Sequence, residues 1–323
     1  MLRYLFPSLF SIILLNTVVT VNAKTISSKN ELNPIPQGGP TLVQAQLVPN
    51  YKDISYRDIS ATQKLDIYLP KNKKKSIPIV IYAHPGGFMF GDKTMASASI
   101  VQGILDSGFA FVSVNYRLSR EAIFPAAVQD FFAAVEYIKE HGNEYGLDSK
   151  NIVVYGESAG ANIVALNGVA YDQPLFRSNL KNPNANVKPR AVIALYPPVD
   201  FNKIEEFTNN QNCKKGDSKE KLPSLEEIYI GGALKNHPEK VKQANPATYV
   251  SSKSSPFFLE NGGKDCNIGT AQALLLKNTL KKYNVPVRYK LLPNAGHGGL
   301  EFETKQNVSL ITEYLKSMVK NGL

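Results

Sequence analysis

Residues 151–170 read NIVVYGESAGANIVALNGVA and join a strand-like run, a turn flanked by glycines and a helical segment. The run NIVVY is rich in β-branched residues, and residues 158–170 have the length and spacing of a helix. Glycine suits positions 156 and 160 because a side chain there would clash as the backbone doubles back. This context is typical of a nucleophile elbow, with Ser158 at its tip. The alternative is an ordinary βα turn with a capping serine.

The same alternation of strand-like runs and helical segments continues on both sides of this turn. The runs are KLDIYLP (64–70), IPIVIYAH (77–84), FAFVSVNYR (109–117), NIVVYG (151–156), AVIALYP (191–197), PFFLENG (256–262) and VPVRYKLLP (285–293). Helices are expected over residues 125–140, 158–170, 269–283 and 303–320. The pattern predicts an α/β fold, a mostly parallel sheet with helices on both faces. Ligands bind such sheets at the carboxyl ends of the strands.

The composition is that of an ordinary globular protein. Of 323 residues, 43% are hydrophobic and 20% charged, and the 22 Gly and 20 Pro fall well below the content of fibrous chains. Two cysteines and four histidines without an HExxH pair argue against a metal centre.

The N-terminus has the features of a secretory signal peptide. Arg3 precedes a largely apolar stretch, and small residues stand at Val21 and Ala23. An uncleaved membrane anchor is the alternative, but Pro7 and Asn16 weaken an already short apolar run. We expect residues 1–23 to be a signal peptide, residues 24–40 a flexible lead-in and residues 41–323 the folded domain, exported to the periplasm or the exterior.

The net charge of +10 would suit an acidic partner, but its distribution indicates a solvated surface. The basic clusters at residues 71–75, 214–215 and 281–282 fall in loops or at helix ends, without interleaved aromatic residues. No nucleic-acid-binding motif is recognisable. We expect neither a nucleic-acid partner nor stable membrane insertion after cleavage.

A serine nucleophile needs a base, and His297 is the best placed of the four histidines. It lies in the loop NAGHGG directly after the last predicted strand, whereas His84 precedes a glycine loop, His141 ends a helix and His237 lies in a polar segment. The order Ser158, acid, His297 matches a triad of the nucleophile-elbow type.

Asp265 is the expected acid because it follows the preceding strand in the loop NGGKD. It would accept a hydrogen bond from Nδ1 of His297 and leave Nε2 facing Ser158. Glu260, within the strand, and Asp200, after the previous strand, are the rival carboxylates.

The loop HPGGF, after the run IPIVIYA, is a candidate oxyanion hole. Pro85 has no N–H, so Gly86 and Gly87 would donate together with Ala159, the residue after the nucleophile. By itself the loop could also be a simple tight turn.

Together these motifs resemble a known family. The stretches concerned are HPGGFMFGDK, NYRLSREAIFPAAVQD, NEYGLDSKNIVVYGESAGAN, NGGKDCNIG and NAGHGG. They look like the α/β-hydrolase carboxylesterases and lipases with an HGGG-type oxyanion loop, in particular bacterial acetyl-esterase-like enzymes related to feruloyl esterases. Pro85 departs from the first glycine of that loop, and Asn261 stands where the family usually has histidine.

The resemblance implies an α/β-hydrolase domain that hydrolyses small-molecule esters through an acyl-enzyme. The implied triad is Ser158, Asp265 and His297, the implied oxyanion donors are Gly86, Gly87 and Ala159, and no cofactor is implied. Short-chain or aryl esters are expected, because only a modest insertion, residues 201–232, is available to cover the site. An amidase or peptidase with the same triad, and a binding protein without catalysis, are the alternatives.

The two cysteines raise the question of a disulfide. Cysteines in an exported chain commonly pair, and a bridge from Cys213 to Cys266 would tie the insertion to the loop of Asp265. In the chain-entropy model a loop of this length is worth about 4 kcal/mol. Spacing alone leaves the pairing open.

Overall fold

The computed structural model describes residues 47–72, 76–211, 213 and 222–319. The predicted signal peptide and lead-in therefore lie outside the described residues, as do the lysines of residues 73–75 and 214–215. None of the described helices is both long and apolar enough to cross a bilayer.

In the described part of the chain, eight strands form one sheet in the order β1-β2-β4-β3-β5-β6-β7-β8. Their bounds are β1 Tyr51–Ser55, β2 Lys64–Tyr68, β3 Ile77–Ala83, β4 Ala110–Val114, β5 Leu147–Glu157, β6 Ala191–Leu195, β7 Phe257–Gly262 and β8 Val287–Leu292. β2 is antiparallel to β1 and β4, and all the other pairs are parallel. The parallel strands thus direct their carboxyl ends to one edge of the sheet.

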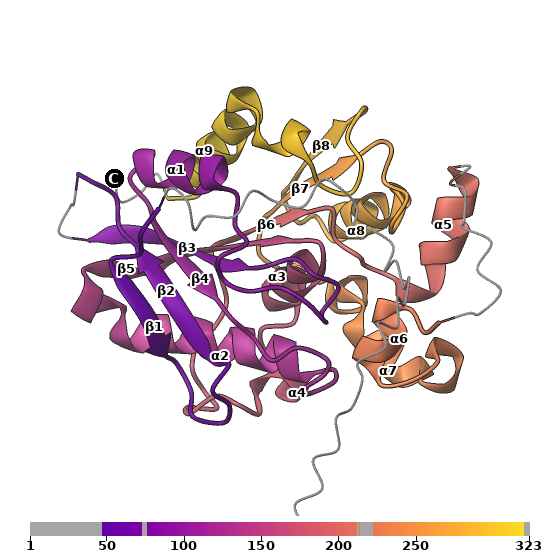
Figure 1. Ribbon diagram of the computed structural model, residues 1–323, viewed down its shortest axis with the longest axis horizontal. Coiled ribbons are helices and arrows are strands. Elements are labelled where there is room, and N and C mark those ends of the chain that lie inside the picture. The colour runs from indigo at the N-terminus through magenta and orange to yellow at the C-terminus, as the bar shows by residue number, and fades with distance from the viewer. Residues whose placement is uncertain (1–46, 73–75, 212, 214–221, 320–323) are drawn as a thin grey trace, which may run out of the picture. The chain divides into compact units, whose positions relative to one another are not determined.

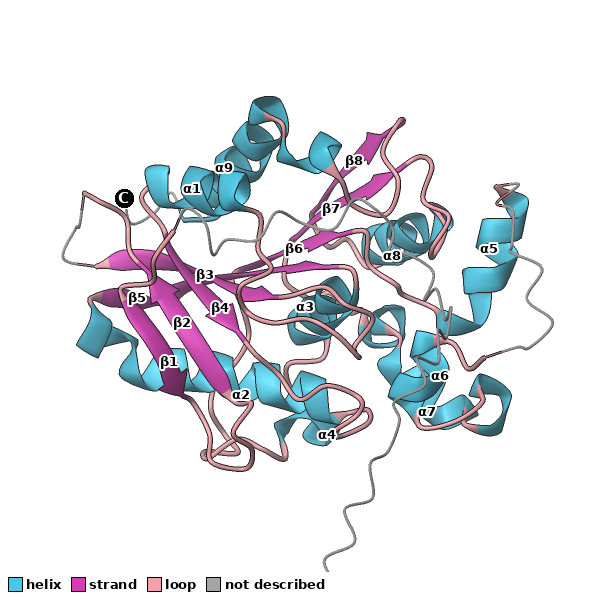
Figure 2. Cartoon of the chain, viewed as in Figure 1, coloured by secondary structure: helices cyan, strands magenta, loops and turns pink. Residues whose placement is uncertain are grey.

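Helices cover both faces of this sheet (Figures 1 and 2). The α-helices are α1 Ala98–Asp106, α2 Ala126–His141, α3 Ala159–Val169, α4 Pro174–Arg177, α5 Ile204–Asn210, α6 Leu225–Ile230, α7 Pro238–Ala244, α8 Ala271–Lys282 and α9 Lys305–Val319. Side chains of α1 and α9 form one apolar core with the sheet, and those of α2, α3 and α8 form a second core on the other face. The predicted α/β class is therefore correct.

The central strands are largely apolar because both of their sides are covered. Every residue of β3, β4 and β6 is buried. All seven predicted strands and all four predicted helices are present, with ends shifted by a few residues. Strand β1 and helix α1 were not predicted, and neither were the short helices between β6 and β7.

The segment between β6 and β7 is larger than the predicted insertion. Helices α5 and α6 fall within residues 201–232, and α7 continues the segment toward β7. Figure 1 places α5, α6 and α7 beyond the ends of β6 and β7. These helices are short, and α6 begins with a capping box in which Ser224 and Glu227 bond each other's backbone N–H. They therefore lack the long apolar periodicity on which helix prediction depends.

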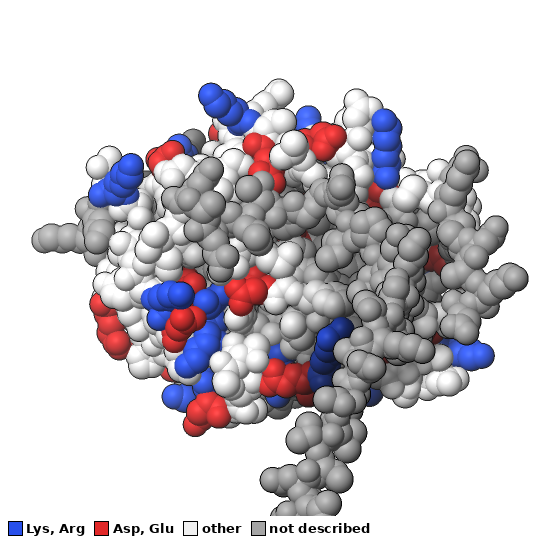
Figure 3. Space-filling view, viewed as in Figure 1, with Lys and Arg blue, Asp and Glu red and all other residues white. Residues whose placement is uncertain are grey.

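Lysine and arginine are mixed with acidic residues on the visible surface. On the face shown in Figure 3, basic side chains lie among Asp and Glu side chains rather than in one continuous basic area.

Candidate active site

Ser158 lies at the turn between β5 and α3, in a backbone conformation that non-glycine residues rarely adopt. Its φ is +51° and its ψ is −119°. The turn is so tight that a Cβ on Gly156 would overlap the carbonyl of Gly160. The N–H of Ser158 donates to the carbonyl of Leu195 in β6 at 3.0 Å, which ties the turn to the neighbouring strand.

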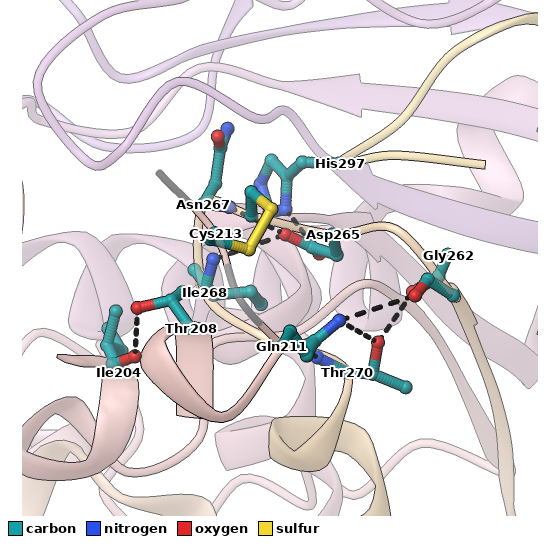
Figure 4. Close-up of a disulfide and its surroundings, with 12 residues drawn as sticks. Ile204, Thr208, Gln211, Cys213, Gly262, Asp265, Asn267, Ile268, Thr270 and His297 are labelled. Atoms are coloured by element: carbon teal, nitrogen blue, oxygen red, sulfur yellow. Dashed lines mark hydrogen bonds and ion pairs between the residues drawn. A yellow bond between two sulfur atoms is a disulfide. The ribbon is translucent and has the colours of Figure 1, made fainter. Parts of the chain in front are cut away.

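The three residues expected to form a triad lie in one chain of hydrogen bonds. Ser158 Oγ is 2.7 Å from His297 Nε2, and His297 Nδ1 is 2.8 Å from Asp265 Oδ2. The other carboxylate oxygen, Oδ1, accepts the backbone N–H groups of Asn267 at 3.0 Å and Ile268 at 3.2 Å. Figure 4 shows Asp265 between these donors and His297. Both oxygens of the carboxylate are therefore satisfied.

The environment of Asp265 keeps it ionised at neutral pH. Its side chain is fully buried, and burial alone would raise the pKa of this carboxyl. The charge and hydrogen bond of His297, with the N–H groups of Ile268 and Asn267, outweigh burial, so the pKa of Asp265 lies below its usual value.

The loops that carry the acid and the histidine are bonded to each other through their backbones. The N–H of Lys264 donates to the carbonyl of Ala295 at 2.9 Å, and that of Gly263 donates to Leu292 at 2.8 Å. These loops follow the adjacent parallel strands β7 and β8. The strand pairing thus sets the distance between Asp265 and His297.

A disulfide joins the acid's loop to the segment that follows α5 (Figure 4). Cys213 and Cys266 are bonded, with their Cα atoms 5.5 Å apart, so the pairing left open by the sequence is present. Two residues before Cys213, the amide of Gln211 donates to Thr270 Oγ1 at 2.9 Å and accepts from the N–H of Thr270 at 2.6 Å. The bridge and Gln211 together attach the insertion to both ends of the loop of residues 265–270.

The loop HPGGF lies beside the nucleophile turn, as its strand order requires. Gly86 and Gly87 have φ values of +125° and +59°, and the part of the structure that is described holds no hydrogen-bond acceptor for their N–H groups. Ala159 is the first residue of α3, where backbone N–H groups lack intrahelical acceptors. α3 packs directly against this loop, since a Cβ on Gly160 would overlap the carbonyl of Ala83. The loop and the first turn of α3 therefore lie side by side.

Helix α6 of the insertion packs on the same loop. A Cβ on Gly87 would overlap the side chain of Leu225, and the ring of Phe88 stacks on Tyr229 with centroids 3.8 Å apart. Leu225 is 37% exposed. Helix α6, in the described part of the insertion, thus covers one side of the loop HPGGF.

The other candidates for the base and the acid, namely His84, Glu260 and Asp200, contact residues outside the triad. The ring of His84 stacks on Tyr116, and burial lowers the pKa of His84 to about 4, so it stays neutral. Glu260 lies inside β7 and accepts from Asn307 at 2.9 Å. Asp200 accepts the N–H of Asn202 at the start of a short 3₁₀ turn.

His141 and His237 lie elsewhere. His141 Nδ1 is 2.8 Å from Glu144, and His237 precedes α7. Across the described ranges, no group of three or more His, Cys, Asp or Glu is arranged to hold a metal ion.

Two further side chains at the site were not identified from the sequence. The ring of Tyr196 packs against His297 with centroids 4.9 Å apart, and its hydroxyl donates to Glu157 at 3.1 Å. Glu157 stands directly before Ser158 in the GESAG motif, so the sequence already places it beside the candidate nucleophile. Its link to Tyr196 requires β5 and β6 to be neighbours.

An eight-stranded sheet with antiparallel first strands, a nucleophile turn after β5 and a histidine loop after β8 defines the α/β-hydrolase fold. The BD-FAE family model matches residues 65–280, about two thirds of the chain. The chain belongs to the BD-FAE family.

Curated relatives and solved structures agree with this assignment. The chain is 25% identical over 270 residues to Esterase LipC and 26% identical over 248 residues to Esterase LipQ, both from Mycobacterium tuberculosis, which covers 82% and 76% of this chain. It spans only 64% and 56% of those two proteins. A truncated carbohydrate esterase from gut microbiota superposes with a TM-score of 0.75 at 25% identity, over 87% of this chain and 99% of that one. Thermogutta terrifontis esterase 2 phosphonylated by sarin has the same fold, with a TM-score of 0.67 at 18% identity over 85% and 96% of the two chains.

Proposed function

We propose that the protein is a serine carboxylesterase that hydrolyses small carboxylic esters through an acyl-enzyme. The observation that carries this proposal is the chain of short contacts from Ser158 through His297 to Asp265, at the ends of β5, β8 and β7. Its family membership and its likeness to esterases support the same reaction class.

In this mechanism Ser158 attacks the ester carbonyl while His297 Nε2 takes its proton. Asp265 holds the tautomer with the proton on Nδ1 and stabilises the imidazolium that forms. The N–H groups of Gly86, Gly87 and Ala159 are placed to stabilise the oxyanion. His297 then gives its proton to the leaving alcohol and activates water for deacylation. None of these steps calls for a cofactor.

The substrate is proposed to be a short-chain or aryl ester. Leu225 lies against Gly87. The acyl chain of an ester whose carbonyl oxygen is bound by Gly86 and Gly87 would therefore meet the Leu225 side chain. We expect kcat/KM to be higher for p-nitrophenyl acetate and butyrate than for the decanoate, and at least about 10³-fold lower for p-nitroacetanilide than for the acetate. Leu225→Ala should narrow the difference in kcat/KM between butyrate and decanoate, because the smaller side chain leaves room for the longer acyl chain. A change of this size in an apolar pocket is worth roughly 1–3 kcal/mol.

Val48→Ala serves as the matched control, because Val48 is 87% exposed and precedes β1 at the edge of the sheet opposite β8. Its selectivity should equal that of the wild type. A wild type that prefers the decanoate would refute the short-chain proposal, and efficient anilide cleavage would favour an amidase.

We further propose that the chain is exported with its first 23 residues removed. The Cys213–Cys266 bridge supports this, because disulfides persist in oxidising compartments. N-terminal sequencing of the mature protein is expected to begin at Lys24. Thiol counting of the denatured, unreduced protein should find no free thiol. An N-terminus at Met1 would contradict cleavage, and two thiols would remove the supporting argument.

A further inference from the structure

A buried carboxyl lies directly behind the nucleophile without a basic partner. Glu157, the last residue of β5, is 2% exposed, and in the described part of the chain no Lys or Arg forms an ion pair with it. Its oxygens accept hydrogen bonds from the hydroxyls of Tyr155 and Tyr196. Burial raises the pKa of Glu157 to about 7, although both hydrogen bonds lower it. Burying an ionisable carboxyl without a basic partner costs folding free energy. Its place directly before Ser158 therefore calls for an explanation.

Tyr196 connects this carboxyl to the catalytic histidine. It follows β6, and its ring lies between His297 and Phe302, with both centroids 4.9 Å away in edge-to-face geometry. Its hydroxyl donates to Glu157 Oε2 at 3.1 Å, and its N–H donates to the carbonyl of Glu260 at 2.6 Å. The ring is therefore held through its hydroxyl and by ring contacts with His297 and Phe302, while the backbone of Tyr196 is held through its N–H.

The backbone of Tyr196 is also in a rarely occupied region. Its φ is +42°, and four other described non-glycine residues also have a positive φ: Ser158 at the end of β5, Phe88 in the loop after β3, and Asp53 and Asn284 elsewhere. Such conformations cost about 1–3 kcal/mol and persist where the surrounding structure enforces them, commonly at functional sites. The strained position of Tyr196 therefore points to a role beyond filling the core.

We propose that Glu157 is a positioning residue: by holding the Tyr196 hydroxyl it keeps that ring against His297, and in its ionised form its charge favours the imidazolium that forms during proton transfer. This inference rests on the esterase function proposed above. Asp265 fixes the imidazole from Nδ1, and Tyr196 would restrict the remaining rotation of the ring.

The other groups around Glu157 do not supply a compensating positive charge. Tyr155 lies on the same strand, and Tyr82 of β3 packs against Tyr155 with centroids 5.0 Å apart. Burial raises the pKa of both phenols well above the usual value, so both are neutral. Glu303, beyond β8, accepts from Ser99 at 3.1 Å and carries the same sign of charge as Glu157. The link from Glu157 to His297 therefore runs through Tyr196, which bonds the carboxyl with its hydroxyl and touches the imidazole with its ring.

Glu157→Gln tests the charge while leaving an acceptor for the Tyr196 hydroxyl. We expect kcat for p-nitrophenyl acetate to fall about tenfold, with KM changed less than about twofold, because the interaction strengthens only as the imidazolium forms. The loss of kcat should be larger at pH 8 than at pH 6, because the wild-type carboxyl, whose pKa burial raises to about 7, carries its charge at the higher pH. Phosphonylation of Ser158 by a serine-directed phosphonate should slow by a similar factor.

Glu260→Gln is the matched control. Glu260 ends near the same edge of the sheet, is fully buried, and has a pKa raised by burial to about 7, yet its side chain bonds Asn307. It should keep the wild-type kcat and pH profile. Tyr196→Phe, which keeps the ring and removes the hydroxyl, should lower kcat about threefold, and combining it with Glu157→Gln should cost less than the product of the two effects.

The inference is overturned if Glu157→Gln retains the wild-type kcat at pH 8 and the wild-type phosphonylation rate, or if Glu260→Gln shows the same changes. Should Glu157→Gln fail to fold, the kcat of Tyr196→Phe decides, and a wild-type kcat for that variant overturns the inference. A wild type that hydrolyses no ester and resists the phosphonate would instead refute the proposed function itself.

Discussion

Ser158→Ala is expected to lower kcat for p-nitrophenyl acetate by about 10⁴–10⁶-fold, because it removes the nucleophile. Residual hydrolysis would come from substrate binding and from the N–H donors of Gly86, Gly87 and Ala159. The fold should persist, since Ala replaces Ser at a position where His297 is the side chain's hydrogen-bond partner. Steady-state kinetics and circular dichroism on both proteins check this.

A serine-directed phosphonate distinguishes the nucleophile from other serines. Peptide mass analysis should place the label on Ser158 in the wild type and find none on Ser158→Ala. Undiminished hydrolysis by the variant, or a label on another residue, would contradict the assignment.

Asp265→Asn should lower kcat by about 10⁴-fold with little change in KM. The asparagine oxygen can still accept from Asn267 and Ile268, but its amide then faces His297 Nδ1 as a donor. That arrangement favours the tautomer protonated on Nε2, which cannot accept the Ser158 proton. Kinetics over a range of pH, with the melting temperature as a measure of folding, check the result.

The rival acids provide the controls. Glu260→Gln and Asp200→Asn are expected to retain the wild-type kcat, because Glu260 bonds Asn307 and Asp200 caps a 3₁₀ turn. If either variant loses as much activity as Asp265→Asn, the acid has been assigned to the wrong residue.

The sequence predicted the parallel core of the sheet. It missed the edge strand and the short helices, because their sequence patterns are weak or too short. Strands buried on both faces, such as IPIVIYA, are continuous apolar runs. The edge strand β1, YKDIS, is mostly exposed and carries no such run. Helix α6 is six residues long, too short for a helical period to be recognised.

Ser158, His297 and Asp265 could be selected from the sequence because parallel strands bring their carboxyl ends to one edge, so residues just after three strands must meet there. The order and spacing of these motifs along the chain therefore determined the fold class and the candidate triad.

Only the tertiary structure decided the contacts between segments that no local pattern relates. The Cys213–Cys266 pairing, the seat of Leu225 on Gly87 and the link from Glu157 through Tyr196 to His297 belong to this group. Periodicity records which side of an element is buried, but not which distant side chain it will touch. That choice depends on the strand order and on how the loops pack once the sheet has formed.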